Sequence, residues 1–243
     1  MIKVVYMATL RNSGIEDEDS IKIPHTNDEK LENNICRARQ KIFELAFCNP
    51  WEWFFTGTLD ATKYDRTDIE KYHQDITYFL WKYGNKHNFK IDFLLIPELH
   101  SDGRTWHMHG LLYGLPEEHL QRLKKGDRMG KALAEKVLAG DPVFNWIPYQ
   151  KKFGFCDLEP IKSAEAVSKY IQKYITKDLA RSITDIGAHL YYHSRGLKGK
   201  EVIKKGTMSC LDIAPSYVGD HCSVWWLPWS EELEQHITSL FVE

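Results

Sequence analysis

Two apolar runs on either side of a short polar turn constrain the fold of this 243-residue chain most strongly. The first run covers residues 91–97 and the second covers 105–113. The segment between them contains an Asp-Gly pair, Asp102-Gly103, which is typical of a tight hairpin turn. The sequence therefore predicts two antiparallel strands, at 90–98 and 105–113, that lie side by side.

The second predicted strand carries two histidines, His107 and His109, which project from the same face about 6–7 Å apart. In a hairpin, Glu98 would lie near them on the neighbouring strand. Two imidazoles and one carboxylate suit Mg, Mn or a similar ion better than a closed thiolate zinc site does. We therefore predict His107, His109 and Glu98 as metal ligands. The alternative is that the histidines are hydrogen-bonded structural residues. His100 and Asp102 are further candidate ligands, but their place in the turn favours solvent exposure.

A second candidate site lies in the segment 163–177, which has the pattern of a helix. Ser163 is a suitable N-cap and Glu165 suits the first turn. Apolar and aromatic residues recur at helical spacing, namely Val167, Tyr170, Ile171, Tyr174 and Ile175. Tyr170 and Tyr174 lie one turn apart at the border of this stripe, and Lys173 and Lys177 lie just beyond them. The stripe is either part of a core or an edge that presents two phenols beside cations, as a nucleophile with a pKa near 10 requires.

Together these motifs resemble the HUH endonucleases, specifically the rolling-circle replication initiators of phages and plasmids. The segment 53–60 (Trp-Phe-Phe-Thr-Gly-Thr-Leu-Asp) is similar to the first family motif, and His107-Met108-His109 matches the second. The tyrosine helix is similar to the third motif in its two-tyrosine form. The resemblance covers roughly residues 50–197. Relaxases of the same superfamily carry their tyrosine before the histidines, whereas here it follows.

The resemblance implies a ferredoxin-like or RRM-like antiparallel sheet of four to five strands flanked by helices. The alternation of adjacent strands with covering helices independently indicates an α+β fold. The implied activity is metal-dependent nicking of a single-stranded origin or hairpin. In it Tyr174 attacks to give a 5′-phosphotyrosine, Tyr170 performs a second transesterification, and Lys173 and Lys177 orient the phosphate or stabilise the phenolate. A host helicase and polymerase are the implied partners. The alternatives are an HUH transposase or mobilisation nickase, and a non-enzymatic RRM-like nucleic-acid-binding protein.

The formal net charge of −2 gives the chain no overall positive field that would attract nucleic acid. DNA contacts are therefore expected from local basic patches, among them the segments 121–128 and 151–152. The patch that we predict to bind DNA lies in the segment 195–205, where five cations accompany the single acid Glu201: Arg195, Lys198, Lys200, Lys204 and Lys205. The alternative for this segment is a solvated loop.

The chain is predicted to be a single domain, 1–243, with a core at about 50–197, an N-terminal strand and helix, and a C-terminal tail. Helices are expected at 31–48, at 67–86 and from 115 onward, and further strands near 153–159 and 188–193. No Gly-rich loop ends in Gly-Lys-Ser/Thr, so no helicase module is expected. Five scattered cysteines, with no signal-peptide or membrane-span pattern, favour reduced thiols in a cytoplasmic protein. The resemblance implies that the cell is a bacterial host.

Overall fold

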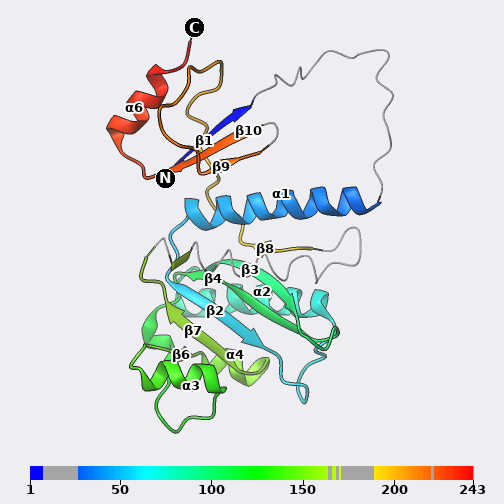
Figure 1. Cartoon of the computed structure of the whole chain (residues 1–243). Helices are drawn as coiled ribbons and strands as arrows, with labels where there is room; N and C mark the ends of the chain where they lie inside the picture. Colours follow the sequence, from blue (N-terminus) through cyan, green and yellow to red (C-terminus); the bar gives the residue numbers. More distant parts are fainter. Residues whose placement is uncertain (8–26, 164–165, 168–169, 171–188, 220–221, 243) are drawn as a thin grey trace. The chain divides into compact units, whose positions relative to one another are not determined.

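The computed structural model of the chain describes residues 1–7, 27–163, 166–167, 170, 189–219 and 222–242. The chain divides into two compact units (Figure 1). The larger unit comprises His25–Lys200, and the smaller one combines Met1–Pro24 with Glu201–Glu243. The N-terminal strand pairs with a strand of the C-terminal segment, and the single domain stays a prediction.

The larger unit is built on an antiparallel sheet with the strand order β5-β6-β7-β2-β4-β3-β8. Its four long central strands are β7 (Cys156–Pro160), β2 (Trp53–Thr58), β4 (Trp106–Tyr113) and β3 (Asp92–Leu99). Three two-residue strands extend it, namely β5 (Gln121–Arg122), β6 (Phe144–Asn145) and β8 (Tyr192–His193). The predicted α+β fold with an antiparallel sheet is confirmed. The sheet has more strands than the four to five expected, because a two-residue strand is too short to show alternation in the sequence.

The predicted hairpin forms from β3 and β4, with Glu98 opposite His107. Its turn is fixed by the Asp102 carboxylate, which accepts hydrogen bonds from the backbone N–H of Arg104 at 2.8 Å and of Thr105 at 2.9 Å. Gly103 has a φ of +67°, a left-handed conformation that glycine adopts without strain. Asp102 is thus exposed, as expected, and is used to shape the turn.

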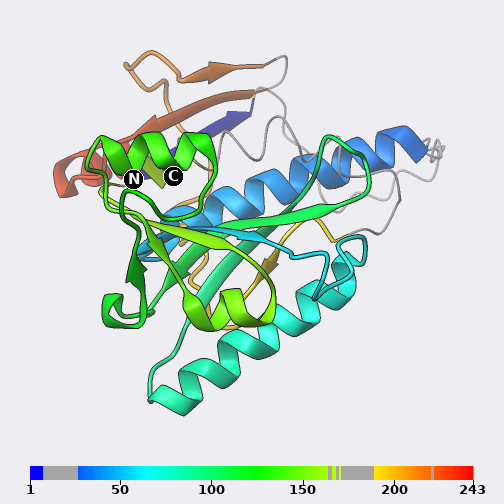
Figure 2. The ribbon, with the colours of Figure 1, turned by 90° about the horizontal axis from the view of Figure 1, so that it is seen from below.

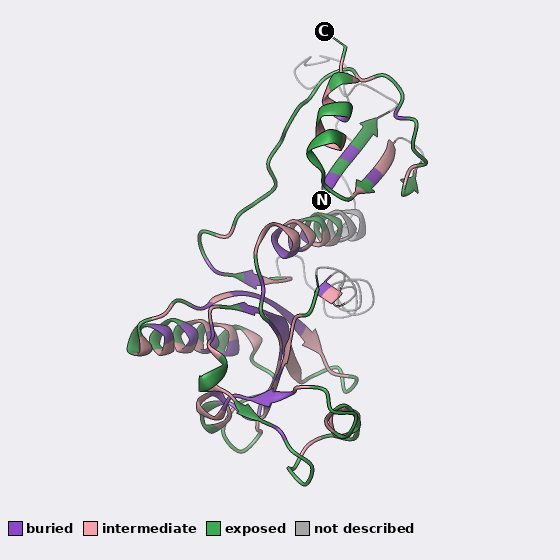
Figure 3. Ribbon diagram, turned by 90° about the vertical axis from the view of Figure 1, so that its left-hand side faces the viewer, coloured by how far each residue is buried: buried purple, intermediate pink, exposed green. Residues whose placement is uncertain are grey.

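Helices cover both faces of this sheet, as Figure 1 shows and Figure 2 shows from below. On one face, Ile42 and Leu45 of α1 (Asn27–Cys48) pack against Leu94 and Leu111. The opposite face is covered by α2 (Ile69–His87) and α4 (Ile147–Lys152), which contribute the buried residues Tyr72, Ile76, Leu80 and Tyr149. Because both faces are covered, buried residues concentrate in the central strands (Figure 3).

The helix α2 has a defined hydrogen-bonded cap at its start and a left-handed residue at its end. Asp68 accepts a hydrogen bond from the Lys71 N–H at 2.9 Å and so caps the first turn. Asn88 ends the helix in a left-handed conformation with a φ of 61°. The predicted helix at 67–86 is confirmed, and so is the one at 31–48, which begins earlier, at Asn27.

The helix predicted from residue 115 onward is wrong. Only a short 3-10 helix, η1 (Glu117–His119), forms there. The chain then leaves the helical conformation to pair β5 with β6, and α3 (Lys131–Leu138) begins only after Gly130. Pairing with the sheet therefore outweighs the favourable first-turn position of Pro116.

The smaller unit contains a three-stranded sheet in the order β1-β10-β9 and one helix. Its elements are β1 (Ile2–Met7), β9 (Tyr217–Val218), β10 (Cys222–Leu227) and α6 (Glu231–Ser239). Ile2, Val4, Trp225 and Ile237 form its core with Leu211.

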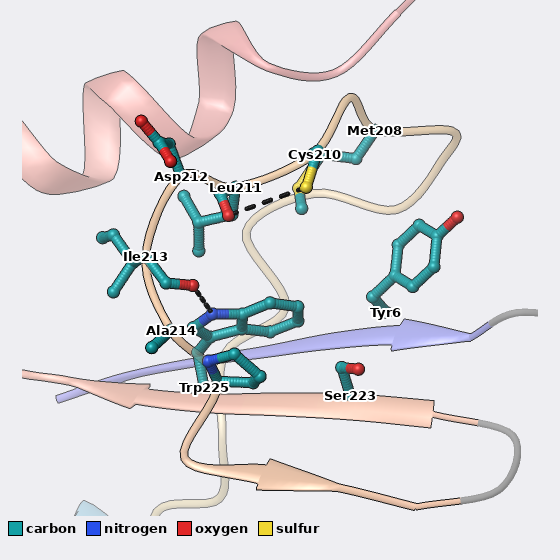
Figure 4. A pocket seen from close by; sticks show the side chains of 10 residues that line it. Tyr6, Met208, Cys210, Leu211, Asp212, Ile213, Ala214, Ser223 and Trp225 are labelled. Carbon is teal, nitrogen blue, oxygen red and sulfur yellow. Dashed lines mark hydrogen bonds between the residues drawn. The ribbon is translucent and has the colours of Figure 1, made fainter.

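A pocket of about 550 Å³ lies within this smaller unit, between the sheet and the loop 208–215 (Figure 4). Trp225 donates a hydrogen bond from its Nε1 to the Ile213 carbonyl oxygen at 2.7 Å and forms part of the lining. No residue predicted from the sequence as part of a functional site lines this pocket. Among the described residues, no helix is long and apolar enough to cross a membrane.

The close approach of β2 to two buried tyrosines gives a stability prediction. A Cβ at Gly57 would lie 2.5 Å from the Tyr149 hydroxyl oxygen and 2.6 Å from that of Tyr72. Both tyrosines are fully buried, so they have no room to withdraw. We expect Gly57→Ala to lower the free energy of unfolding in urea by about 1–3 kcal/mol. Gly130→Ala is the control, because its Cβ would meet no atom within 4 Å, and a loss of similar size there would contradict the steric explanation.

Candidate active site

Polar residues gather at one end of the sheet, on the face that α1 covers elsewhere. The strand register sets Glu98, His107 and Thr58 in one row across β3, β4 and β2. His109 and Thr56 lie in the next row, where Thr56 is also paired with Asp157 of β7. Because side chains two residues apart share a face, these polar groups lie together while the neighbouring Leu94, Leu111 and Phe54 continue that face as core.

Each histidine is oriented by a threonine of the adjacent strand. Thr58 Oγ1 lies 3.1 Å from His107 Nδ1, and Thr56 Oγ1 lies 3.4 Å from His109 Nδ1. A partner on Nδ1 leaves Nε2 available for another ligand, which is the usual arrangement of metal-binding histidines. The Thr-x-Thr spacing of the segment 53–60 thus mirrors the His-x-His spacing. This Thr-x-Thr spacing is visible in the sequence, but the sequence alone did not indicate that the threonines orient the histidines.

The Nε2 atoms of the two histidines meet different partners. His109 Nε2 contacts a carboxylate oxygen of Glu98, and His107 Nε2 contacts Nε2 of His100. His100 is half-buried and its ring centroid lies 3.9 Å from that of His107, so the expectation of an exposed His100 is wrong. The His100 N–H donates to the Thr105 carbonyl oxygen at 2.8 Å, so the pairing of the two strands continues to His100 and its side chain lies on the same face as that of Glu98.

His107 has the protonation state that a metal ligand needs. Burial, with smaller effects from the neighbouring histidines, lowers the pKa of His107 to about 4, so its imidazole is neutral at pH 7. A neutral imidazole offers a lone pair for coordination. His109 itself is 7% exposed and is therefore protected from bulk water.

The donor set fits a divalent ion in its chemistry, with up to three imidazoles and one carboxylate on one face. The side chains form two contacting pairs, Glu98 with His109 and His100 with His107, and the ring centroids of His107 and His109 are 6.2 Å apart. Within the part of the chain that the structure describes, no three His, Cys, Asp or Glu side chains already converge on one point. Side-chain rotation about fixed backbone positions would be needed to join the two pairs in one shell.

Asp157 adds a buried carboxyl to the same face. Burial, reinforced by the negative charge of Glu159, raises the pKa of Asp157 to about 7. A hydrogen bond with Thr56 acts in the opposite direction, which links Asp157 through Thr56 to His109. Glu159 is itself paired with Lys136 at 2.6 Å. The alternation of acids in β7 could have revealed this carboxyl from the sequence.

Tyr170 lies on this face of the sheet with its hydroxyl engaged. The hydroxyl donates to the Phe55 carbonyl oxygen at 3.0 Å and accepts from the Gly110 N–H at 3.2 Å. Its ring stacks on Phe54 with centroids 4.4 Å apart. Since Gly110 follows His109 in β4, the phenol lies next to the histidine row. The start of its helix is confirmed, because Ser163 Oγ accepts a hydrogen bond from the Ala166 N–H at 3.1 Å.

The other predicted catalytic residues, Tyr174, Lys173 and Lys177, lie outside the described residues. The five predicted DNA-binding residues are all exposed and belong to two units. Arg195, Lys198 and Lys200 lie in the larger unit, and Lys204 and Lys205 in the smaller one. Their role in DNA binding stays a prediction.

Charge is distributed unequally between the two units. Residues 25–200 contain 27 Lys and Arg against 23 Asp and Glu, whereas the smaller unit contains 5 and 11. The unit that holds the candidate site therefore has a net positive charge, which the overall value of −2 conceals. A nucleic acid would be attracted to this unit and repelled by the other.

Two histidines and a carboxylate on one face of an antiparallel sheet are suited to binding a metal ion or a phosphate. A family model described as "Replication-associated protein ORF2" matches residues 52–179, which is just over half of the chain. The chain therefore belongs to this family of replication-associated (Rep) proteins. The matched segment includes Glu98, His107, His109 and both tyrosines. Comparisons with curated proteins and with solved structures gave no significant match.

The raised pKa of Asp157 predicts how stability depends on pH. A carboxyl with a folded pKa of about 7 and an unfolded value near 4 keeps its proton only in the folded state between these values. Its contribution to stability is therefore present at low pH and is lost as the pH rises toward 7. Asp157→Asn removes this loss, so its stability relative to wild type should increase by at least ~1 kcal/mol between pH 5 and pH 8, in urea unfolding with EDTA.

Asp65→Asn serves as the control for this measurement. Hydrogen bonds from Thr67 lower the pKa of Asp65, so its carboxyl is ionised in both states above pH 5. The stability difference between this variant and wild type should be flat over the same range. A flat difference for Asp157→Asn as well would mean that the Asp157 carboxylate is already ionised in the folded protein.

Proposed function

We propose that the chain is a metal-dependent, sequence-specific endonuclease and ligase of single-stranded DNA that initiates rolling-circle replication of a phage or plasmid. The observation that carries the proposal is the row of His107 and His109, each oriented by a threonine and faced by Glu98 or His100. This arrangement lies within the segment that matches the Rep family. It would be an unusual arrangement for a purely structural core, which rarely holds three imidazoles and a carboxylate on one face.

His107, His109 and Glu98 would hold a Mg or Mn ion, and His100 is added here as a fourth candidate ligand. A bound ion would polarise the scissile phosphate and offset the charge that develops on it. The threonines would keep the two imidazoles in place, so that the phosphate meets a preorganised site. In this donor set the carboxylate suits Mg or Mn, whereas the imidazoles suit a transition-metal ion.

Tyr174 is our candidate nucleophile. Its phenolic oxygen would form a bond to phosphorus as the bond to the 3′ oxygen breaks, which gives a 5′-phosphotyrosine and a free 3′-hydroxyl. The proton lost by the phenol balances the one gained by the leaving 3′ oxygen. Lys173 and Lys177 would stabilise the phenolate or orient the phosphate. The covalent link conserves the bond energy, so that the reverse reaction rejoins the strand without ATP.

Tyr170 is the candidate for the second transesterification, which would end a replication round. Its hydrogen bonds to Phe55 and Gly110 impose a condition on this role, because they must break before the phenol can attack. The same contacts place the phenol beside the histidine row. Tyr170 would therefore act only after a local rearrangement, whereas Tyr174 is our choice for the first attack.

The proposed substrate is a single-stranded origin or hairpin, attracted by the net positive charge of the larger unit. Arg195, Lys198, Lys200, Lys204 and Lys205 remain our candidates for contacts with DNA phosphates. A host helicase would separate the strands, and a host polymerase would extend the freed 3′-hydroxyl.

The metal ligands can be tested by substitution. His107→Ala and His109→Ala each remove one imidazole from a rigid strand, so Mn²⁺ binding should weaken at least tenfold and cleavage should be abolished. Glu98→Gln keeps the shape and removes the charge, so both should be reduced without being lost. Mn²⁺ affinity is measured by electron paramagnetic resonance, and cleavage on denaturing gels with single-stranded replicon DNA. His236→Ala, an exposed histidine of the smaller unit, is the matched control, and wild-type behaviour of all three site variants would refute the metal site.

The nucleophile can be identified by the adduct it leaves. Tyr174→Phe deletes one hydroxyl, so it should abolish the covalent adduct with end-labelled single-stranded DNA. Tyr170→Phe should still form the adduct but lose strand transfer, and its stability should fall by about 1 kcal/mol because two hydrogen bonds to the sheet are removed. Peptide mapping of the wild-type adduct assigns the linkage.

Tyr78→Phe is the control for these variants, because Tyr78 is an exposed tyrosine of α2 and should behave as wild type. An adduct on Tyr170 alone would reverse the two roles. No adduct with any divalent metal, together with intact binding of single-stranded DNA, would favour the non-enzymatic alternative.

A further inference from the structure

The loop between β2 and α2 holds an arginine, Arg66, beside the candidate site. The Arg66 carbonyl oxygen accepts a hydrogen bond from the Trp106 N–H at 3.0 Å, one residue before His107. The loop is stiffened next to this point, because the Asp65 carboxylate accepts from both the N–H and the hydroxyl of Thr67, at 2.8 and 2.7 Å. The backbone of Arg66 is thus attached to the start of β4.

The guanidinium of Arg66 is only partly satisfied. Its Nη2 donates a long hydrogen bond of 3.4 Å to Thr105 Oγ1, and its Nε is buried without a hydrogen-bond partner. Among the residues that the structure describes, no Asp or Glu forms an ion pair with it. Asp65 is used by Thr67, and Asp68 caps α2. A guanidinium is always charged, and a buried donor without a partner costs about 1–3 kcal/mol, so this arrangement calls for a ligand.

Arg66 lies beside the candidate metal site. Its carbonyl oxygen and its Nη2 bond to Trp106 and Thr105, the two residues before His107. The side chain is also half-buried, unlike Arg104 in the adjacent turn, which is exposed. A fixed, unpaired cation beside a candidate metal site is suited to an anion that the metal also binds.

We propose that Arg66 binds the DNA phosphate that reacts at the His107–Glu98 face, with the remaining N–H groups of its guanidinium donating to two oxygens of the phosphodiester. A planar guanidinium matches two phosphate oxygens in this geometry, whereas a lysine offers only a point charge. Thr105 is anchored by the Asp102 carboxylate, to which its hydroxyl donates at 2.7 Å, and its bond to Arg66 Nη2 is long, so it restrains the guanidinium only weakly. The role of Arg66 rests on the proposed function, since it assigns the phosphate to the same site.

Two measurements on Arg66→Gln test this assignment. Binding of a fluorescent dT20 oligonucleotide, followed by anisotropy at several salt concentrations, should weaken about tenfold in the presence of Mn²⁺. The slope of log K against log salt should fall by about 0.7, the value for one phosphate contact on a single strand. Mn²⁺ affinity without DNA should stay within about twofold of wild type, which separates a phosphate contact from damage to the metal ligands. Arg66→Lys should recover the salt slope but only part of the cleavage rate.

Two control variants separate this role from the alternatives. Thr105→Val removes the hydrogen bond that the structure shows for Arg66, so an equal loss in this variant would mean that Arg66 only supports the turn. Arg104→Gln removes an exposed arginine of the same turn, and an equal loss there would reduce the effect to general charge attraction. Either outcome overturns the assignment.

The same experiments distinguish this inference from the proposed function. If the wild-type protein cleaves replicon DNA and Arg66→Gln has the same dT20 affinity, salt slope and cleavage rate, the role of Arg66 is refuted and the endonuclease is left intact. The wild-type protein could instead bind dT20 but never cleave single-stranded replicon DNA, while Arg66→Gln lowers the salt slope of dT20 binding. This result would keep the phosphate contact and refute the endonuclease.

Discussion

The antiparallel pairing of β4 with β2 on one side and β3 on the other is the constraint on which the candidate site depends. This register places His107 between Glu98 and Thr58, and it places His109 beside Thr56. Because side chains alternate along a strand, a slip by one residue would turn both histidines to the opposite face, into the packed layer under α2. The hydrophobic pattern prevents such a slip, since Met108 and Leu112 belong to the core on that side. The packing of the sheet and the placement of the imidazoles are therefore one property of the same strand.

The site is electrostatically unusual for a protein whose overall charge is near zero. Imidazoles, carboxyls and an arginine share one end of a sheet, and burial moves their proton equilibria toward the neutral forms of His107 and Asp157. The surrounding unit has a net positive charge, because 11 of the acidic residues belong to the smaller unit. The arrangement is suited to a polyanion that is attracted by the whole unit and then bound by a few groups. Composition averaged over the chain hides this division.

The position of Tyr170 connects the catalytic hypothesis to the fold. The helix starts at a serine cap and sets this tyrosine onto the backbone of β2 and β4, where its hydroxyl bonds to Phe55 and Gly110. These contacts fix the start of the helix relative to the histidine row. Its hydrogen bonds and its stacking on Phe54 give Tyr170 a structural role, which does not depend on any reaction. The two interpretations of the apolar stripe, as a core element and as the carrier of a nucleophile, are thus compatible.

Local patterns in the sequence determined the hairpin, the helices capped by Asp68 and Ser163, the α+β class and the pairing of Glu98 with the histidines. Each of these depends on spacing within a few residues, or on two runs joined by a tight turn, which the order of residues alone specifies. Only the tertiary structure decided what lies across strands that are distant in sequence. It joined Thr56 and Thr58 to the histidines and brought Asp157 to the same face. It turned His100 inward, and it paired β1 with β10 in a separate acidic unit. These contacts follow from sheet order and burial, which depend on how the whole chain packs. Alternations such as Thr56-x-Thr58 show which residues share a face of one strand, but they do not show which strand lies beside it.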